Sequence, residues 1–143
     1  YFLGIPYVWG SIYRFDGQAS VFAPRLRRNE DALDQSSASG GPCYRCLYPE
    51  PPPPDDVWTC SQVGVLGAVA GVMGTLQATE VLKEIMDIGQ SMRGRLLIFD
   101  ALAGTTRMVK VKPDPSCKLC GPNATIRDLS IHRDSDSGRI CVA

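Results

Sequence analysis

The stretch TCSQVGVLGAVAGVMGTLQATEVLK, residues 59–83, decides the fold of this chain, because it holds the longest helical pattern in the sequence. Its first part is rich in glycine and alanine, and its second part is amphipathic. The apolar side of the second part consists of Ala78, Val81, Leu82 and Ile85. Its polar side consists of Glu80, Lys83 and Glu84. The pattern predicts one helix over residues 61–87, with these charged residues outside and Gly89 as C-cap.

The glycines of this helix indicate how closely it packs. Each glycine costs a helix roughly 1 kcal/mol relative to alanine, so repeated glycines predict close approach to a sheet or a partner helix. Residues 57–79 contain no charge and include a GxxxG motif, so a transmembrane helix is the alternative. The strictly apolar part, residues 63–76, is shorter than the ~20 residues that a bilayer requires. A buried core helix is therefore favoured.

Two β-hairpins flank the helix in the sequence. The first is predicted from residues 7–15 and 18–22, with a turn at Asp16–Gly17. The second is predicted from residues 95–100 and 105–112, with a turn at Ala103–Gly104. The first pair is rich in β-branched and aromatic residues, and the second has an apolar side of Met108, Val109 and Val111, so both pairs predict strands.

The remaining segments lack these patterns. Residues 23–42 are charged and then small and polar, so we expect a mobile loop. Pro51–Pro54 predict a stiff polyproline II segment at the surface. An SH3-type ligand is the alternative there, but a flanking basic anchor is missing. Residues 122–143 are polar without a period, which predicts a flexible tail after a domain of residues 1–121.

The composition of the chain limits its class. The 143 residues fit one domain, and the 15 basic and 15 acidic residues cancel, so nothing indicates binding to nucleic acid or to an anionic membrane. The sequence begins with Tyr1 and shows no signal peptide, so we expect a fragment of a larger unit. Without a secretory signal, its six cysteines favour a reducing, cytoplasmic setting over disulfides.

Four of the cysteines form two CxxC motifs, Cys43/Cys46 and Cys117/Cys120. Each CxxC turn places two thiolates on one side, and two such turns complete a tetrahedron around a structural zinc ion. Arg45 and Lys118, inside the two motifs, would offset the charge of four thiolates. The alternatives are a redox pair, which usually needs a helix N-terminus, or two unrelated free pairs. We expect zinc, pinning the second motif to the middle of the domain.

Cys60 stands alone directly before the predicted helix. A thiol at a helix N-terminus is stabilised as thiolate, so Cys60 is a candidate nucleophile. The alternative, favoured by local chemistry alone, is a small buried residue at a helix start. Neither Cys141 nor His132, the single histidine, receives a role. The sequence shows no Ser/His/Asp set, no paired carboxylates and no glycine-rich phosphate loop after a strand.

Four motifs together resemble the C-terminal half of the MoeB/ThiF family, which adenylates ubiquitin-like sulfur carriers. They are CYRCLYPEPPPP at 43–54, residues 59–83, GRLLIFDALAGTTR at 94–107 and DPSCKLCG at 114–121. The opening PYVWGSIYRFDGQASVF, residues 6–22, resembles MoeZ-type members that continue into a rhodanese domain. The resemblance covers residues 1–122.

The resemblance implies a doubly wound α/β fold of the ubiquitin-activating type, a homodimer, and zinc on the two CxxC pairs. It also implies that ATP and Mg²⁺ adenylate the C-terminal glycine of a carrier similar to MoaD or ThiS. Sulfur, from a rhodanese or a cysteine desulfurase, then replaces AMP for molybdopterin, thiamine or thiolated-tRNA synthesis. Cys60 falls where relatives carry the cysteine that attacks the acyl-adenylate or carries the sulfur.

The nucleotide loop, the phosphate-binding arginine and lysine, and the magnesium aspartate of this family belong to the N-terminal half. None of them occurs in this chain, so we expect the chain alone to be inactive. Three functions remain open: part of an adenylating enzyme, a zinc-stabilised carrier-binding module without catalysis, or a dimerising half that completes a separate N-terminal chain.

Overall fold

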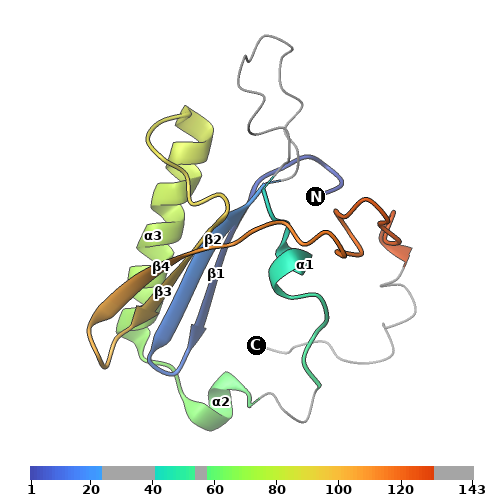
Figure 1. Ribbon diagram of the computed structural model, residues 1–143. Helices are drawn as coiled ribbons and strands as arrows, with labels where there is room; N and C mark the ends of the chain where they lie inside the picture. The colour runs from blue at the N-terminus through green and yellow to red at the C-terminus, as the bar shows by residue number, and fades with distance from the viewer. Residues whose placement is uncertain (24–40, 54–57, 131–143) are drawn as a thin grey trace.

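A computed structural model describes residues 1–23, 41–53 and 58–130 (Figure 1). Most of the mobile loop predicted over 23–42, and most of the flexible tail predicted over 122–143, lies outside these residues, as do His132 and Cys141. Residues 122–130 are described, and the amides of Thr125 and Ile126 donate hydrogen bonds to the Lys118 carbonyl, each at 2.9 Å. The domain boundary after residue 121 stays a prediction.

The four predicted strands are confirmed, and they form one sheet in the order β1-β2-β3-β4 with antiparallel neighbours. The strands are β1 (Tyr7–Tyr13), β2 (Asp16–Phe22), β3 (Arg95–Asp100) and β4 (Thr105–Lys110). The fold class is therefore mixed α and β. The doubly wound arrangement stays a prediction, because the paired strands of the described residues are all antiparallel.

The predicted turn at Asp16–Gly17 is wrong. Tyr13 already pairs with Asp16, and the chain turns at Arg14 and Phe15, where Arg14 has φ of 52°. Gly17 serves a different purpose, since a Cβ there would lie 2.5 Å from the sulfur of Met73. This glycine lets a helix approach the sheet closely.

The single helix predicted over 61–87 is also wrong, because the chain forms two helices. They are α2 (Cys60–Val63) and α3 (Gly67–Met86). Between them Gly64 has φ of +74°, and the Leu66 amide donates to the Arg14 carbonyl at 2.9 Å. The chain thus leaves the helix to contact the β1–β2 turn. The helix α3 ends at Met86, and Asp87, which has φ of 52°, takes the C-cap position predicted for Gly89.

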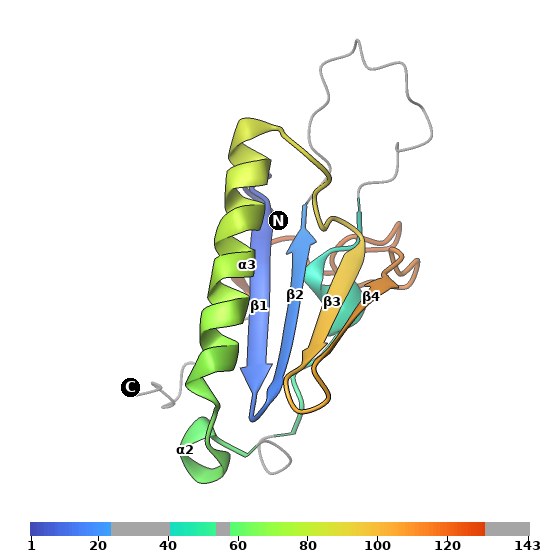
Figure 2. The same ribbon diagram turned by 90° about the vertical axis from the view of Figure 1, so that its left-hand side faces the viewer.

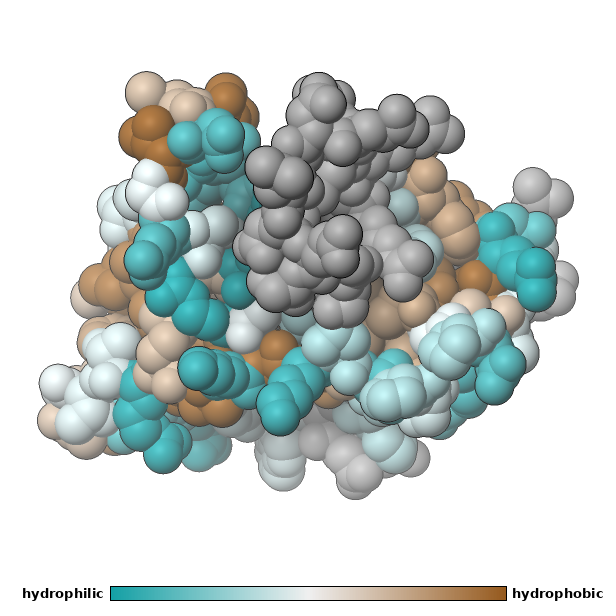
Figure 3. Space-filling view, turned by 45° about the horizontal axis from the view of Figure 1, so that its top comes forward, coloured by the Kyte–Doolittle hydropathy of each residue, from teal (hydrophilic) through white to brown (hydrophobic). Residues whose placement is uncertain are grey.

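The helix α3 lies along β1 and β2 (Figure 2). Val69 and Met73 are buried against the sheet in a cluster with Ala19, Val21, Met92 and Leu97. The predicted orientation of its second half is wrong, because Glu80 is buried while Leu82 and Ile85 are 56% and 75% exposed. At the upper left of the space-filling view, where α3 ends, hydrophobic residues lie at the surface beside hydrophilic ones (Figure 3).

The predicted close approach through the helix glycines is not found within the described residues. A Cβ on Gly67, Gly71 or Gly74 would meet nothing within 4 Å. These glycines and the exposed Leu82 and Ile85 leave an uncovered side on α3. None of the described helices has the length and apolar character needed to cross a membrane.

The opposite face of the sheet carries an aromatic cluster under the short helix α1 (Tyr44–Leu47). Trp9, Phe22 and Leu96 are its buried members. Tyr44 and Tyr48, at the two ends of α1, pack on them, with the Trp9 and Tyr48 rings 5.3 Å apart. This packing places α1, and with it the first CxxC motif, at a fixed position on the sheet.

Candidate metal centre

The structure brings together all four cysteines of the CxxC motifs. The sulfur atoms of Cys43, Cys46, Cys117 and Cys120 all lie within 4.8 Å of one another. The Cys43–Cys117 and Cys46–Cys120 sulfur distances are 3.6 and 3.3 Å, and the Cys43–Cys46 distance is 3.8 Å. A tetrahedral zinc ion with Zn–S bonds of ~2.3 Å needs sulfur atoms about 3.8 Å apart. The four cysteines therefore fit one metal ion.

The first CxxC turn is built on α1. Cys43 is the N-cap residue of this helix, and the Cys46 amide donates to the Cys43 carbonyl at 3.0 Å. One helical turn thus brings both sulfur atoms to the same side. Because Tyr44 and Tyr48 anchor α1 in the aromatic cluster, this half of the site is held by the core of the domain.

The second CxxC turn is held by local hydrogen bonds. The Asp114 carboxylate accepts hydrogen bonds from the amide and hydroxyl of Ser116, at 2.8 and 2.7 Å. The Gly121 amide donates to the Cys117 carbonyl at 3.0 Å and closes the turn. A Cβ on Gly121 would lie 2.6 Å from that carbonyl oxygen, so only glycine fits here. The position of Gly121 directly after the motif predicts a turn, whereas the close contact with the Cys117 carbonyl is visible in the structure alone.

The four thiols affect one another's ionisation. Burial and hydrogen bonds from neighbouring thiols raise the pKa of Cys43, and burial with the neighbouring Cys46 thiol raises the pKa of Cys120 to about 11. Burial also acts to raise the pKa of Cys117, but hydrogen bonds from the Cys120 and Leu119 amides outweigh it and lower this pKa to about 7. A bound divalent cation would stabilise all four thiolates, so this donor set suits a metal ion.

The charged groups of Arg45 and Lys118 bind oxygen atoms near the site. Arg45 donates to the Pro49 carbonyl at 2.8 Å, and Lys118 pairs with Glu50 at 2.7 Å. Contacts to sulfur come instead from backbone amides, with the Asp114 amide 3.4 Å from the Cys46 sulfur. Backbone donors stabilise thiolates, and they carry no residue-specific pattern. That Arg45 and Lys118 offset the charge of four thiolates stays a prediction.

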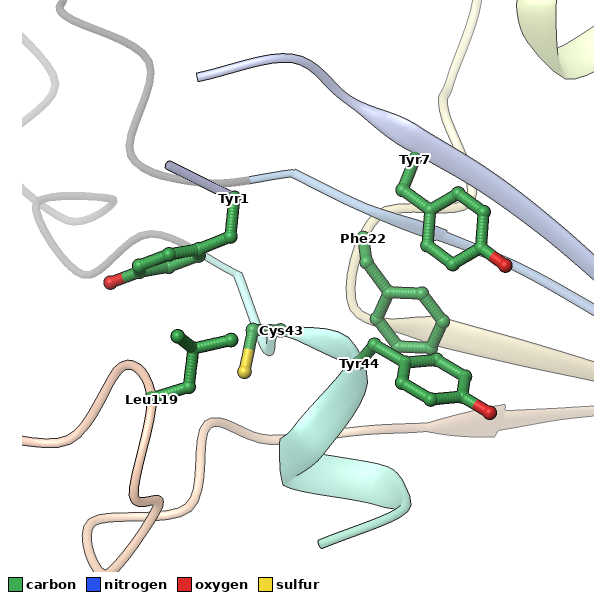
Figure 4. A pocket seen from close by; sticks show the side chains of 6 residues that line it. All are labelled: Tyr1, Tyr7, Phe22, Cys43, Tyr44 and Leu119. Atoms are coloured by element: carbon green, nitrogen blue, oxygen red, sulfur yellow. The ribbon is translucent and has the colours of Figure 1, made fainter. Parts of the chain in front are cut away.

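The two sides of the site differ in exposure. Cys43 and Cys117 are buried, while Cys46 and Cys120 are partly exposed. Cys43 also borders a cavity of about 60 Å³, where Figure 4 shows its side chain beside that of Leu119. The cavity is lined by Tyr1, Tyr7, Phe22, Cys43, Tyr44 and Leu119. Solvent therefore reaches the site more easily from Cys46 and Cys120.

Cys60 lies outside this cluster, at the start of α2. It is exposed, so the alternative of a small buried residue is wrong. Thr59 and Gln62 form a capping box around it, with the Thr59 amide donating to the Gln62 side chain at 2.8 Å. The expected long helix does not start here, since α2 has only 4 residues and α3 begins at Gly67. The stabilising effect expected from a long helix dipole is correspondingly weaker.

Comparison with known proteins identifies the same family as the order of the four sequence motifs. Residues 1–119 match the ThiF family. The chain belongs to this family. It is 43% identical over 127 residues to a sulfur carrier protein adenylyltransferase of Thermus thermophilus. The match covers 89% of this chain and 44% of that protein.

Two further relatives have related names. The SAMP-activating enzyme E1 of Haloferax volcanii is 42% identical over 120 residues, which cover 84% of this chain and 39% of that protein. The probable adenylyltransferase/sulfurtransferase MoeZ of Mycobacterium tuberculosis is 48% identical over 113 residues, covering 79% of this chain and 26% of that protein. The chain thus spans less than half the length of the curated relatives it matches.

Proposed function

We propose that this chain is the C-terminal part of an ATP-dependent adenylyltransferase that activates a ubiquitin-like sulfur carrier. The observation that carries the proposal is the family match over residues 1–119, together with relatives named for sulfur carrier adenylation. The product would be the carrier with its C-terminal glycine adenylated, ready for thiocarboxylate formation. The carrier would resemble MoaD or ThiS, and the free thiols of the site fit a cytoplasmic protein.

The ATP and Mg²⁺ sites would lie in an N-terminal half that completes a doubly wound fold. Two features of this chain support that arrangement. The strand β1 lies at one edge of the sheet, and α3 beside it has the uncovered side formed by Gly67, Gly71, Gly74, Leu82 and Ile85. A second domain half, and a second subunit of a homodimer, would supply apolar surface to cover it.

Zinc would occupy the four-cysteine site in a structural role. Bound there, it would supply a closed four-thiolate link between the two CxxC turns and no open coordination position. Cys43 and Cys46 would hold it from α1, and Cys117 and Cys120 from the segment after β4. This segment would then be fixed over the sheet face that carries the aromatic cluster.

Cys60 would be the nucleophile that attacks the acyl-adenylate or carries sulfur. Its exposure supports access by a carrier tail, and the Thr59–Gln62 capping box holds the backbone around it. A rhodanese domain or a cysteine desulfurase would supply the sulfur. The zinc cysteines would not take this role, because coordination occupies their sulfur atoms.

Carrier-dependent exchange of pyrophosphate into ATP tests the proposal. The full-length protein that contains this chain is expected to catalyse exchange when a carrier with an intact C-terminal glycine is present. A carrier that lacks this glycine serves as the control. The 143-residue chain alone is expected to give none. Carrier binding by the full-length protein without exchange would support the alternative, a zinc-stabilised binding or dimerisation module without catalysis.

A further inference from the structure

We propose that the ion pair between Lys118 and Glu50 is a latch that keeps the two CxxC turns closed and sets the rate at which the metal leaves. This inference rests on the proposed zinc site. Neither residue contributes a ligand atom. Both are positioning residues, one from each half of the site.

The pair joins two segments that are far apart in the sequence. Lys118 lies between the ligands Cys117 and Cys120, and Glu50 follows the ligand Cys46 by four positions. Their side chains meet at 2.7 Å across a separation of 68 residues. Apart from contacts among the sulfur atoms, backbone amides join these segments: the Asp114 amide lies 3.4 Å from the Cys46 sulfur, and the Cys43 amide donates a hydrogen bond to the Cys120 thiol. The ion pair adds a contact between two charged side chains to these backbone contacts.

Both partners come from segments that are already ordered. The Lys118 carbonyl accepts hydrogen bonds from the amides of Thr125 and Ile126. Arg45 holds the Pro49 carbonyl at 2.8 Å, directly before Glu50. An ion pair between ordered segments loses less conformational entropy on forming than one between free side chains. The backbone around the pair is thus arranged to favour it.

The difference in exposure shows where the pair acts. Cys43 and Cys117 are buried, whereas Cys46 and Cys120 are open to solvent in part. A chelator therefore reaches Cys46 and Cys120 first, and zinc transfer starts with separation of these two ligands. Glu50 follows one of them, and Lys118 precedes the other by two positions. Their attraction opposes the movement that transfer requires.

The expected effect is small but specific. The side chains of Lys118 and Glu50 are 59% and 69% exposed, so the pair is screened by solvent and salt. Loss of such an exposed pair is expected to accelerate zinc transfer by about two- to fivefold. In high salt the wild-type rate is expected to approach that of the variants.

The test is the rate of zinc transfer from the zinc-loaded, full-length protein to a chromogenic chelator. Lys118→Met, Glu50→Gln and the double variant are expected to transfer zinc faster than wild type by the same factor. Lys118→Arg, which keeps the positive charge, is expected to retain the slow rate. Lys110→Met, at an exposed position on β4, is the matched control and is expected to leave the rate unchanged.

Two results would overturn the latch. Equal rates for wild type and Lys118→Met overturn it while leaving the zinc site intact. Transfer as fast in Lys118→Arg as in Lys118→Met overturns it too, because the rate then does not follow the charge at position 118. Elemental analysis before each run separates these from failure of the site itself, because protein without zinc overturns the site and the latch together.

Discussion

The carboxylate of Glu80 on α3 accepts a hydrogen bond from the backbone amide of Met92 at 2.8 Å, and both groups are buried. Glu80 also forms an ion pair with Lys83. The segment between α3 and β3 is thereby fastened to the helix. This contact explains why α3 turns a charged residue inward and the apolar Leu82 and Ile85 outward.

Glu80→Ala is expected to destabilise the fold, because it leaves the buried Met92 amide without an acceptor. The expected loss in the free energy of unfolding is about 1–3 kcal/mol. Glu80→Gln keeps an acceptor oxygen and is expected to lose less. Urea unfolding of the zinc-loaded protein measures both. Equal stability of wild type and Glu80→Ala would mean that this contact does not hold the segment in place.

Gly121→Ala is expected to damage the second CxxC turn, since the new Cβ would lie 2.6 Å from the Cys117 carbonyl oxygen. Such overpacking costs about 1–3 kcal/mol. The expected result is faster zinc transfer to a chelator and a lower unfolding temperature. Gly41→Ala is the control, because the nearest atom to its new Cβ, the Gly94 amide nitrogen, would lie 3.9 Å away, which is ordinary van der Waals contact. A Gly121→Ala protein that keeps zinc like wild type would contradict the assigned role.

The stability of the fold is expected to fall in acid through Glu84. Burial acts to raise the pKa of this carboxyl, but Arg93 and Ser91, which bind it, outweigh burial and lower the pKa below its usual value. Because the pKa is lower in the folded than in the unfolded state, the stabilisation is complete above the unfolded pKa. It is lost as the pH falls through the folded pKa.

The contribution of Glu84 to stability is measured by the midpoint of urea unfolding at a series of pH values from neutral to acidic. Arg93→Met is expected to flatten the pH dependence, because the carboxyl loses its main partner. Glu84→Gln, which cannot titrate, is expected to flatten it equally. If Glu84→Gln keeps the full wild-type slope, the acid sensitivity originates from other groups.

Cys60→Ala is expected to abolish sulfur transfer to the carrier in the full-length protein and to leave carrier adenylation largely intact. Alkylation of the zinc-loaded protein at neutral pH is expected to label Cys60 ahead of the four CxxC cysteines, since Cys60 is exposed and bound zinc would occupy the other four sulfur atoms. Cys60→Ser is the matched control for side-chain size. Normal sulfur transfer by Cys60→Ala would leave Cys60 without a chemical role.

Gly71→Leu in the full-length protein tests whether another part of the protein covers α3. The new side chain would meet open space within the described residues. If a second half or a second subunit packs there, the variant is expected to lose stability or dimerisation. Size-exclusion chromatography and thermal unfolding measure both. Unchanged behaviour would mean that this side of α3 faces solvent.

The sequence was sufficient to predict the strands and the grouping of the four CxxC cysteines, and the role of these cysteines as metal ligands stays a prediction. Alternating β-branched and apolar residues mark β1 to β4, and the CxxC spacing fixes how two sulfur atoms lie within each turn. That Cys43/Cys46 would meet Cys117/Cys120 followed from the preference of zinc for four ligands. The structure confirms that these four cysteines meet.

The features that escaped prediction depend on contacts between distant residues. The inward turn of Glu80 depends on the Met92 amide, which lies outside the helix. The break at Gly64 depends on the contact of Leu66 with Arg14 in the first hairpin. The pattern of apolar residues within 61–87 does not depend on these distant contacts. It therefore predicts one helix where there are two, and it places Glu80 at the surface although Glu80 is buried.

The zinc content of the purified protein after washing with a weak chelator tests the account most directly. Elemental analysis is expected to give about one zinc per chain for wild type, as a four-cysteine structural site requires. Cys117→Ser is expected to lose the metal and to unfold at a lower temperature, while Cys60→Ser keeps both properties. Wild-type protein that is folded and holds less than about a tenth of an equivalent would contradict the metal centre on which the account rests.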